Sequence, residues 1–314
     1  MGENLSSYFI TGGNGFIGAA LVKRLVAEGH HVRVMLRAGA NAERIRNVLA
    51  KIEIVQGDFE HLDAVRASLE GHAADAIIHA AWMGVTAAQR NSIQQITVNI
   101  PATLRLCELA AATHCGAFVG LGSQAEFGSV SGLLDEHTPP NPATAYGFAK
   151  YHAGELSRRV CSLAGMRFIW LRVLSVYGPG DDEAHMLPTL IRCLLRGEKP
   201  KLTSGLQKWD YLYVDDCAAA ISSVLKSGVE GAFVLGSGET TTIREVVELV
   251  RDKIDKRLPL GFGEMSSSAP VVNLQANIEH LTITTGWRPE VSLSQGLELT
   301  IASIAGVGAQ PKFP

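Results

Sequence analysis

The chain has 314 residues, of which 46% are hydrophobic and 19% charged, and its formal net charge is −3. Such a chain is long enough to bury a large core and has the composition of an ordinary globular protein. A disordered chain is thereby excluded, and the small negative charge gives no indication of a nucleic-acid partner.

The five cysteines are scattered and form no Cys-x-x-Cys pair. This distribution is typical of reduced thiols that serve as packing residues, so we expect neither a disulfide framework nor a metal site. The N-terminus lacks the pattern of a signal peptide, and no segment has about eighteen uninterrupted apolar residues. We therefore expect a cytoplasmic protein with no membrane partner.

From Ser7 to Val173, short β-branched runs alternate with amphipathic helical stretches, which is the order that builds a parallel sheet with helices on both faces. This rhythm predicts the α/β class and a doubly wound Rossmann domain. After Val173 the pattern becomes irregular and predicts a smaller C-terminal lobe.

The predicted strands are 8–11, 32–36, 52–56, 76–79, 117–122 and 168–173, with a return strand at 233–235. Later helices are predicted at 187–195, 215–226 and 242–256. We place the Rossmann domain at 1–174 with returning segments at about 210–258, and the substrate-binding lobe at 175–209 and about 259–314.

A glycine-rich loop, Thr11-Gly12-Gly13-Asn14-Gly15-Phe16-Ile17-Gly18, follows the first predicted strand and precedes a helical run. Glycines at 12, 15 and 18 permit a tight turn, close approach of a pyrophosphate and close packing of helix on strand. Because the loop stands between strand and helix, it predicts a dinucleotide cofactor. The residues expected to contact it are Gly12, Gly15, Phe16, Ile17 and Gly18.

The residue after the second strand indicates which dinucleotide is bound. NAD-binding domains usually place an acidic residue there for the adenosine ribose, whereas this chain has Arg37 and no carboxylate before Glu43. Arg37 is placed to pair with a 2′-phosphate, which favours NADP(H) over NAD. An arginine in a solvated loop is the alternative interpretation. Asp58 follows the third strand and is either an acceptor for the adenine amino group or a turn residue.

Three further residues suggest the chemistry. Tyr146 and Lys150 are four residues apart at the start of a predicted helix, so both side chains would lie on one face. A lysine ammonium and a bound nicotinamide would stabilise a phenolate and allow proton transfer. Ser123 follows the fifth strand, at the edge where open α/β sheets bind ligands, and its hydroxyl could hold a substrate oxygen. The tyrosine–lysine spacing carries little weight alone; the combination and order of these features is what indicates a catalytic site.

At these residues the sequence resembles the extended short-chain dehydrogenase/reductase family, the group of nucleotide-sugar epimerases, dehydratases and 4-ketoreductases. The resemblance runs nearly end to end and includes TGGNGFIG, GDFEHLDAV, His79-Ala80-Ala81, TVNIPAT, YGFAK, LRVLSVYGPG, WDYLYVDDCAAAI and GWRPEVSLSQGL. It implies that Tyr146 is the acid/base, that Lys150 lowers the pKa of Tyr146 and binds the nicotinamide ribose, and that Ser123 orients the reacting oxygen. Further cofactor contacts are implied at Asp58, Phe59, Ala80, Ala81, Asn99 and Val173.

The chain departs from the family pattern near the substrate. Gln124-Ala125 stand where the 4,6-dehydratase branch has an Asp-Glu pair, so the acid and base for water elimination are lacking. Glu126 is one position out of register, and we interpret it as structural. Trp209 replaces the arginine that commonly grips the nucleotide diphosphate, and Ser175 replaces an asparagine. The expected substrate contacts are Trp82, Gln124, Ser175, Lys208, Trp209 and Arg288.

These observations predict an NADPH-dependent ketoreductase, acting on C4 of a nucleotide-activated 4-keto-6-deoxy sugar. A nucleotide-sugar epimerase with tightly bound NAD is the first alternative, and a dehydratase is the next. A non-catalytic NADP(H)-binding sensor or scaffold is the alternative from another class, but it would have no need of the Ser/Tyr/Lys set. The helices predicted at 101–113 and 149–163 correspond to those that pair in dimers of the family, so we expect a homodimer.

Overall fold

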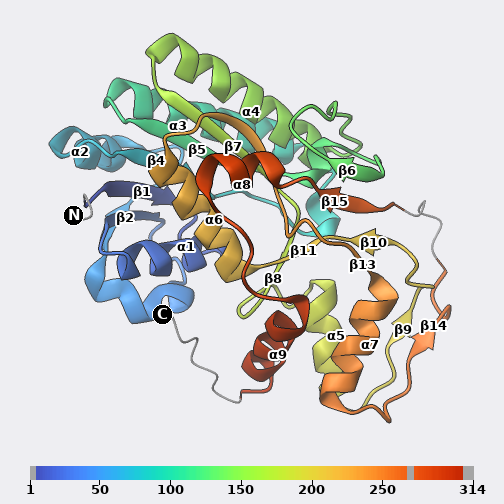
Figure 1. Cartoon of the computed structure of the whole chain (residues 1–314). Helices are drawn as coiled ribbons and strands as arrows, with labels where there is room; N and C mark the ends of the chain where they lie inside the picture. The colour runs from blue at the N-terminus through green and yellow to red at the C-terminus, as the bar shows by residue number, and fades with distance from the viewer. Residues whose placement is uncertain (1–4, 267–271, 307–314) are drawn as a thin grey trace.

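A seven-stranded parallel sheet forms the centre of the computed structural model, which describes residues 5–266 and 272–306 (Figure 1). Its strand order is β12-β7-β5-β4-β1-β2-β3, a Rossmann arrangement with one added strand. All seven predicted strands are present. The sheet strands are β1 Ser7–Thr11, β2 His31–Leu36, β3 Glu53–Gln56, β4 Ala76–His79, β5 Ala117–Ser123, β7 Arg167–Val173 and β12 Gly231–Leu235. Successive strands are added on one side of β1 up to β3 and on its other side from β4 onward. Sheets of this kind open a ligand-binding crevice at such a switch point, here between β1 and β4.

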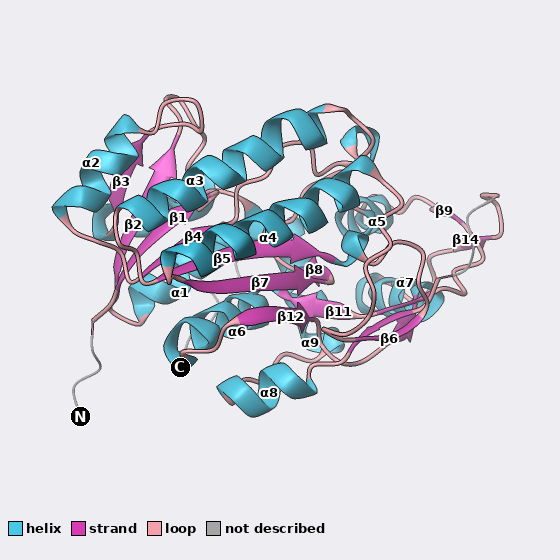
Figure 2. Ribbon diagram, turned by 90° about the horizontal axis from the view of Figure 1, so that it is seen from above, coloured by secondary structure: helices cyan, strands magenta, loops and turns pink. Residues whose placement is uncertain are grey.

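Helices cover both faces of this sheet, and a buried apolar cluster lies under each layer (Figure 2). On one face, α1 (Phe16–Ala27) and α6 (Val214–Ser227) pack against Ile10, Val119 and Leu171. On the other face, Ile77 and Phe118 are covered by α2 (Asp63–Gly71), α3 (Ile100–Ala112) and α4 (Ala145–Ala164). The central strands β1, β4 and β5 are buried on both faces because helices cover both faces, as is usual for parallel sheets. The remaining elements of this part are η1 Glu43–Lys51, η2 Ala87–Gln89, η3 Gln95–Asn99, η4 Gln124–Glu126 and β6 Gly132–Leu134.

Trp170 on β7 fills the space above two glycines of β5 and one of α4. A Cβ atom added at Gly120 would lie 2.1 Å from Trp170 Cζ3, and one added at Gly122 would lie 2.4 Å from Nε1. At Gly154 the corresponding distance, to Trp170 Cε2, is 2.8 Å. Because these positions carry no side chain, α4 packs closely over the end of β5.

The smaller lobe is built on three helices, α5 (Met186–Leu195), α7 (Ile243–Ile254) and α9 (Leu293–Ile304), which share one buried cluster. Thr242 caps α7 in a capping box, in which its hydroxyl accepts from the Glu245 N–H and the Glu245 side chain accepts from the Thr242 N–H. The other elements after β7 are β8 Ser175–Tyr177, β9 Lys201–Leu202, β10 Lys208–Trp209, β11 Tyr211–Tyr213, β13 Thr241–Thr242, β14 Gly261–Phe262, β15 Leu274–Ala276 and α8 Glu279–Thr285.

The two units interleave along the chain. Of the predicted returning segment 210–258, β12 joins the sheet and α6 covers one of its faces, whereas α7 packs with α5 and α9. Conversely α8, in the segment predicted for the lobe, contacts α6 and β12. We therefore propose a division that assigns α7 to the lobe and α8 to the Rossmann domain, because each helix buries its apolar face there.

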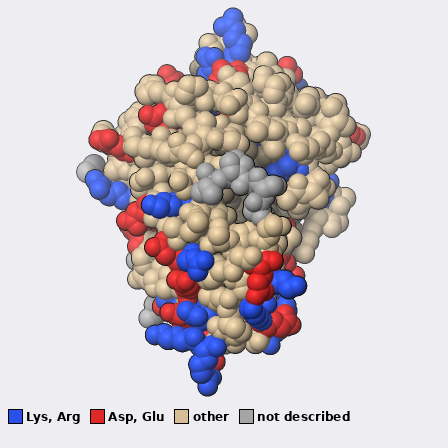
Figure 3. Space-filling view, turned by 90° about the vertical axis from the view of Figure 1, so that its right-hand side faces the viewer, with Lys and Arg blue, Asp and Glu red and all other residues tan. Residues whose placement is uncertain are grey.

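Positive and negative side chains intermingle over the lobe in the view of Figure 3. On α7, for example, Arg244 pairs with Glu248 and Arg251 with Asp252. This face of the lobe therefore presents no large patch of one sign. Within the described residues, none of the helices has the length and apolar character needed to cross a membrane.

Candidate active site

Ser123, Tyr146 and Lys150 come together where β5 ends and α4 begins. Ser123 is the last residue of β5, and Tyr146 and Lys150 lie in the first two turns of α4. Thr144 caps this helix by accepting from the Gly147 N–H, which fixes where the first turn starts. All three side chains are buried, with exposed fractions of 9% for Ser123 and Tyr146 and 5% for Lys150. The structure thus forms the constellation that the sequence indicated.

Burial dominates the electrostatics of the tyrosine and the lysine. It raises the pKa of Tyr146, while hydrogen bonding to Ser123 and the charge of Arg90 oppose that rise. It lowers the pKa of Lys150 to about 7, and attraction to Glu126 opposes that fall. Lys150 Nζ donates to the carbonyl of Leu121 at 2.6 Å and lies 5.9 Å from the centre of the Tyr146 ring. The ammonium is therefore close enough to stabilise negative charge that develops on the phenol.

A capping box holds Ser123 in place. Its hydroxyl oxygen accepts from the Ala125 N–H at 3.2 Å, and its own N–H donates to Glu126 Oε1 at 2.8 Å. Glu126 is 1% exposed and also accepts from Trp170 Nε1 and Arg172 Nε, both at 3.0 Å. A carboxylate with these three partners has little freedom to exchange protons with a substrate. The geometry supports the structural interpretation of Glu126.

The segment between β4 and α3 closes one side of the site. Trp82 lies edge-on to Tyr146, with ring centres 6.2 Å apart, and the Arg90 guanidinium is 5.4 Å from the Tyr146 ring centre. The Arg90 carbonyl also accepts from the Tyr146 N–H at 2.8 Å. Gln95 and Asn99, on the π-helical turn η3, bond to this segment and to each other. The sequence predicts Trp82 as a substrate contact and Asn99 as a cofactor contact; here the Asn99 side chain bonds to Met83 and Gln95. It gives no indication of Arg90 or Gln95, because no local pattern shows that this segment folds back over α4.

The glycine loop fits a dinucleotide. Gly12 has a φ of 71° and approaches the backbone that follows β4 so closely that a Cβ atom would lie 2.5 Å from the Ala81 nitrogen. At Gly18, a Cβ atom would lie 2.1 Å from the Gly12 oxygen. No side chain caps α1 at Gly15, so the first N–H groups of the helix remain available to a pyrophosphate. Phe16 and Ile17 belong to this first turn.

Arg37 and Asp58 line the same pocket, of about 370 Å³, beyond the ends of β2 and β3. Arg37 is exposed, and its guanidinium has no hydrogen-bond or ion-pair partner within residues 5–266 and 272–306. Asp58 Oδ1 accepts from the Glu60 and His61 N–H groups at 2.8 Å each, and these bonds lower its pKa. Asp58 thus acts as a turn residue here. Its other oxygen, Oδ2, has a single longer contact among the described residues, at 3.4 Å from His61 Nδ1.

Three of the expected cofactor residues lie at the ends of central strands. Ala80 and Ala81 directly follow β4, next to Gly12, and Val173 pairs in register with Ser123. Phe59, which follows Asp58 in the loop after β3, packs edge-on against His79 on β4, with ring centres 5.5 Å apart.

The expected substrate residues are more dispersed. Gln124 follows Ser123, and its Oε1 is buried without a hydrogen-bond partner in the described part of the chain. Ser175 begins β8, and Trp209 packs on the apolar cluster around Phe127. Lys208 and Arg288 are exposed. The described contacts link none of the last four to Ser123, Tyr146 or Lys150.

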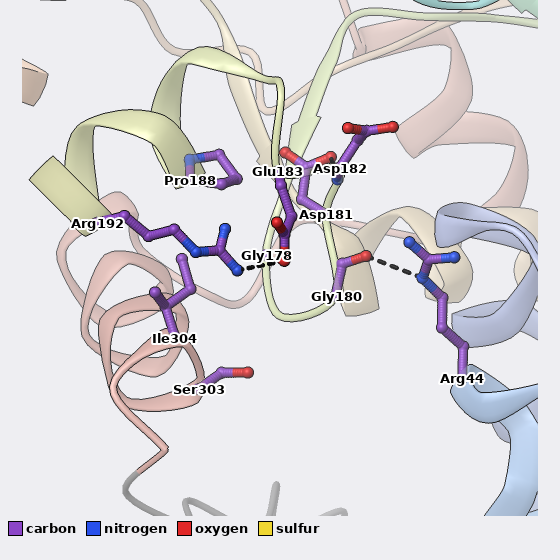
Figure 4. A pocket seen from close by; sticks show the side chains of 10 residues that line it. All are labelled: Arg44, Gly178, Gly180, Asp181, Asp182, Glu183, Pro188, Arg192, Ser303 and Ile304. Carbon is purple, nitrogen blue, oxygen red and sulfur yellow. Dashed lines mark hydrogen bonds and ion pairs between the residues drawn. The ribbon is translucent and has the colours of Figure 1, made fainter.

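A cavity of about 420 Å³ lies elsewhere, between η1, the loop after β8, α5 and the end of α9 (Figure 4). Arg44 Nε donates to the Gly180 carbonyl at 2.9 Å across its edge, and Arg192 pairs with Glu183. None of its lining residues is among the expected site residues. The candidate site lies where Ser123, Tyr146 and Lys150 converge and not at this cavity, because only there do groups that can exchange a proton with a substrate come together.

Comparison with known proteins places the chain in a family. The profile of the NAD dependent epimerase/dehydratase family matches residues 8–236, and the chain belongs to that family. It is accordingly an NAD(P)-dependent enzyme.

Similar proteins span almost the whole chain. It is 29% identical over 315 residues to the UDP-glucose 4-epimerase of Mycolicibacterium smegmatis, covering 93% of this chain and 96% of that one. It is 27% identical over 297 residues to the CDP-abequose synthase of Salmonella muenchen, covering 92% and 94%. The structure of the Bacillus cereus UDP-glucuronic acid 4-epimerase with UDP-glucuronic acid and NAD superposes with a TM-score of 0.84. That pair is 22% identical and covers 96% and 100% of the two chains. At this identity the superposition demonstrates the shared fold.

Proposed function

We propose that the protein is an NADPH-dependent reductase of a keto group on a nucleotide-activated sugar, with C4 of a 4-keto-6-deoxy sugar as the reacting position. The observation that carries the proposal is Arg37, a cation with no partner among the residues that the structure describes. It shares a pocket with Asp58, at the strand end where NAD enzymes carry a carboxylate. A 2′-phosphate would pair with this guanidinium. Relatives named for UDP-glucose and CDP-abequose support the nucleotide-sugar class.

When bound, NADPH supplies the hydride for such a reaction. The protein residues manage the proton and the orientation of the carbonyl. Ser123, held by its capping box, would donate a hydrogen bond to the keto oxygen. Tyr146 would deliver a proton to the same oxygen, and the Lys150 ammonium would stabilise the phenolate left behind. The buried Gln124 oxygen, which has no partner in the described ranges, would accept from a sugar hydroxyl, but an amide cannot act as the acid of a dehydratase.

The first test separates reductase from epimerase. Small molecules released by denaturing freshly purified protein are identified by mass spectrometry, and the emptied protein is titrated with NADPH and NADH. A strong preference for NADPH, lost in Arg37→Ala but retained in the matched control Arg46→Ala, supports the proposal. Arg46 lies nearby on η1 but pairs with Glu43. Trapped stoichiometric NAD would instead favour an epimerase and would assign Arg37 to a solvated loop.

An epimerase remains the second candidate because relatives and solved neighbours carry that name and a neighbour was solved with NAD. It would interconvert two nucleotide sugars without net consumption of added NADPH. Turnover with a nucleotide-activated 4-keto sugar and NADPH therefore distinguishes the two activities.

We also propose a homodimer that pairs α3 and α4 of each subunit. The outer face of α4 exposes Phe148, Leu156 and Leu163, an apolar stripe with helical spacing. Light scattering should give twice the mass of one chain, and Leu156→Lys should reduce it to that of a monomer. A monomeric wild type would refute the dimer.

A further inference from the structure

The buried ammonium of Lys150 has two neighbours that can stabilise its charge. One is the Leu121 carbonyl, at 2.6 Å, and the other is the face of the Trp82 indole, whose ring centre lies 3.7 Å from Nζ. Lys150 forms no ion pair within residues 5–266 and 272–306, and Glu126 attracts it only from farther away. An ammonium has three N–H donors, and a tryptophan face attracts a cation most strongly where water is excluded. Trp82 therefore provides the contact that a second acceptor would otherwise make.

The orientation of Trp82 is fixed by a buried amide. Its Nε1 donates to Gln95 Oε1 at 2.8 Å, and Gln95 is 1% exposed. The Gln95 amide donates to the carbonyls of Gly84 and Gln89 at 2.6 and 3.1 Å, and its oxygen also accepts from Asn99 at 3.1 Å. The indole cannot rotate away from Lys150 without losing its bond to Gln95. The π-helical turn Gln95–Asn99 directs both amides to this segment, in line with the frequent occurrence of such turns at functional sites.

We propose that Trp82 is a positioning residue for Lys150: its indole face, held by Gln95, keeps the amine charged and directed toward Tyr146. This role rests on the proposed Ser/Tyr/Lys chemistry and is separate from any contact of Trp82 with substrate. It gives the segment between β4 and α3 a function in proton transfer at a site that α4 and β5 build.

Loss of the indole face should make the ammonium less stable. Burial already lowers the pKa of Lys150 to about 7, so removing an attractive contact should lower it further, by about one unit. The other groups that face Lys150 are Glu126 from η4, His79 from β4 and Tyr146 from α4. Burial lowers the pKa of His79 to about 3, so it stays neutral across the range of the test.

A fluorescence titration tests the contact without any substrate. Tryptophan emission responds to a charge over the ring, so the full-length protein should show an emission step near pH 7. We expect Lys150→Met and Trp82→Phe each to remove this step. Trp287→Phe should retain the emission step, because Trp287 is buried in the apolar cluster on the opposite face of the sheet from Trp82. A wild type without the step, or a step that survives in Trp82→Phe, would overturn the proposal.

The kinetic test uses the pH dependence of kcat/KM. In Trp82→Leu the fall of kcat/KM on the basic side of the profile should occur at a pH about one unit lower than in the wild type. Trp82→Phe keeps an aromatic face and should shift this pH less. Gln95→Leu should shift it in the same direction as Trp82→Leu, because the indole is no longer anchored. A loss of activity with an unchanged limb in all three variants would identify Trp82 as a packing residue and overturn the proposal. If the wild type reduces no keto sugar, the proposed function fails, while the fluorescence titration still decides the role of Trp82.

Discussion

The backbone N–H of Ser123 donates to Glu126 Oε1 at 2.8 Å, and the other oxygen of Glu126 accepts from Arg172 at 3.0 Å. The serine of the candidate site is thus held by a buried ion pair. Both ions are almost inaccessible, and Arg172 Nη1 has no hydrogen-bond partner in the described chain. Removal of one ion would leave the other as an uncompensated buried charge, which costs more than the pair itself contributes.

Glu126→Leu should therefore lower the free energy of unfolding by about 3–5 kcal/mol. The double variant Glu126→Leu/Arg172→Leu should be more stable than Glu126→Leu, because it leaves no isolated ion. Urea denaturation followed by circular dichroism measures both. The exposed pair of Arg158 and Glu155 is the control, and Glu155→Ala should cost about 1 kcal/mol or less. If the double variant were no more stable than Glu126→Leu, the isolated charge of Arg172 would not be the reason for the lower free energy of unfolding in Glu126→Leu.

Tyr146→Phe should lower the rate of keto reduction about 100- to 10,000-fold, because the proton donor is removed while the ring and its packing remain. NADPH affinity should change little. Single-turnover measurements of NADPH oxidation give the rate, and fluorescence titration gives the affinity. Tyr151→Phe, five residues further along α4, is the matched control and should turn over normally. An active Tyr146→Phe enzyme would refute the whole catalytic assignment.

The pH dependence of kcat/KM should report Lys150 in the free enzyme. Its pKa is lowered to about 7 because burial disfavours the charged form. The ammonium is needed to stabilise the phenolate, so kcat/KM for reduction should fall as the pH rises above about 7. Steady-state assays at limiting substrate from pH 5.5 to 9.5 test this. A profile that stays level up to pH 9 would mean that Lys150 remains protonated there.

His79 should make the protein less stable in acid. Its ring nitrogens lie 2.8 Å from Thr11 Oγ1 and 3.0 Å from Thr103 Oγ1, and burial lowers its pKa from 6.5 to about 3. Between these two values the unfolded chain binds a proton that the folded chain does not, so stability rises with pH there. The contribution of neutral His79 to the free energy of unfolding is complete above pH 6.5. It should be lost at about 1.4 kcal/mol per pH unit as the pH falls toward 3.

Urea denaturation between pH 7.5 and 4.5 compares wild type with His79→Gln, which should depend less on pH. His31→Gln, at an exposed position, is the control. Equal slopes for wild type and His79→Gln would refute the assignment of the acid sensitivity to His79.

The sequence predicted the sheet well because its signals are local. Each central strand is a short apolar run, and the glycine loop stands between a strand and a helix, so β1, α1 and the position of Ser123 follow from neighbouring residues alone. The pair Tyr146 and Lys150 was predictable for the same reason, since four-residue spacing places two side chains on one helix face.

The surroundings of the site depend instead on contacts between distant segments. Arg90 reaches Tyr146, and Glu126 meets Arg172 46 residues further along the chain. No periodicity or motif indicates either contact. The lobe was the least predictable part because its helices bury their apolar faces on segments that are remote in sequence, as α7 does on α5 and α9.

The fit of Trp170 against Gly120, Gly122 and Gly154 limits how this protein can evolve. An alanine at any of the three would collide with the indole at 2.1 to 2.8 Å, and a smaller side chain at 170 would leave a void beneath the residues that carry the chemistry. Neither change is tolerable without the other. Homologues that descend from this sequence should therefore keep all four residues or exchange them together. A homologue in which only one of the four has changed would indicate that selection on the catalytic end of β5 has relaxed.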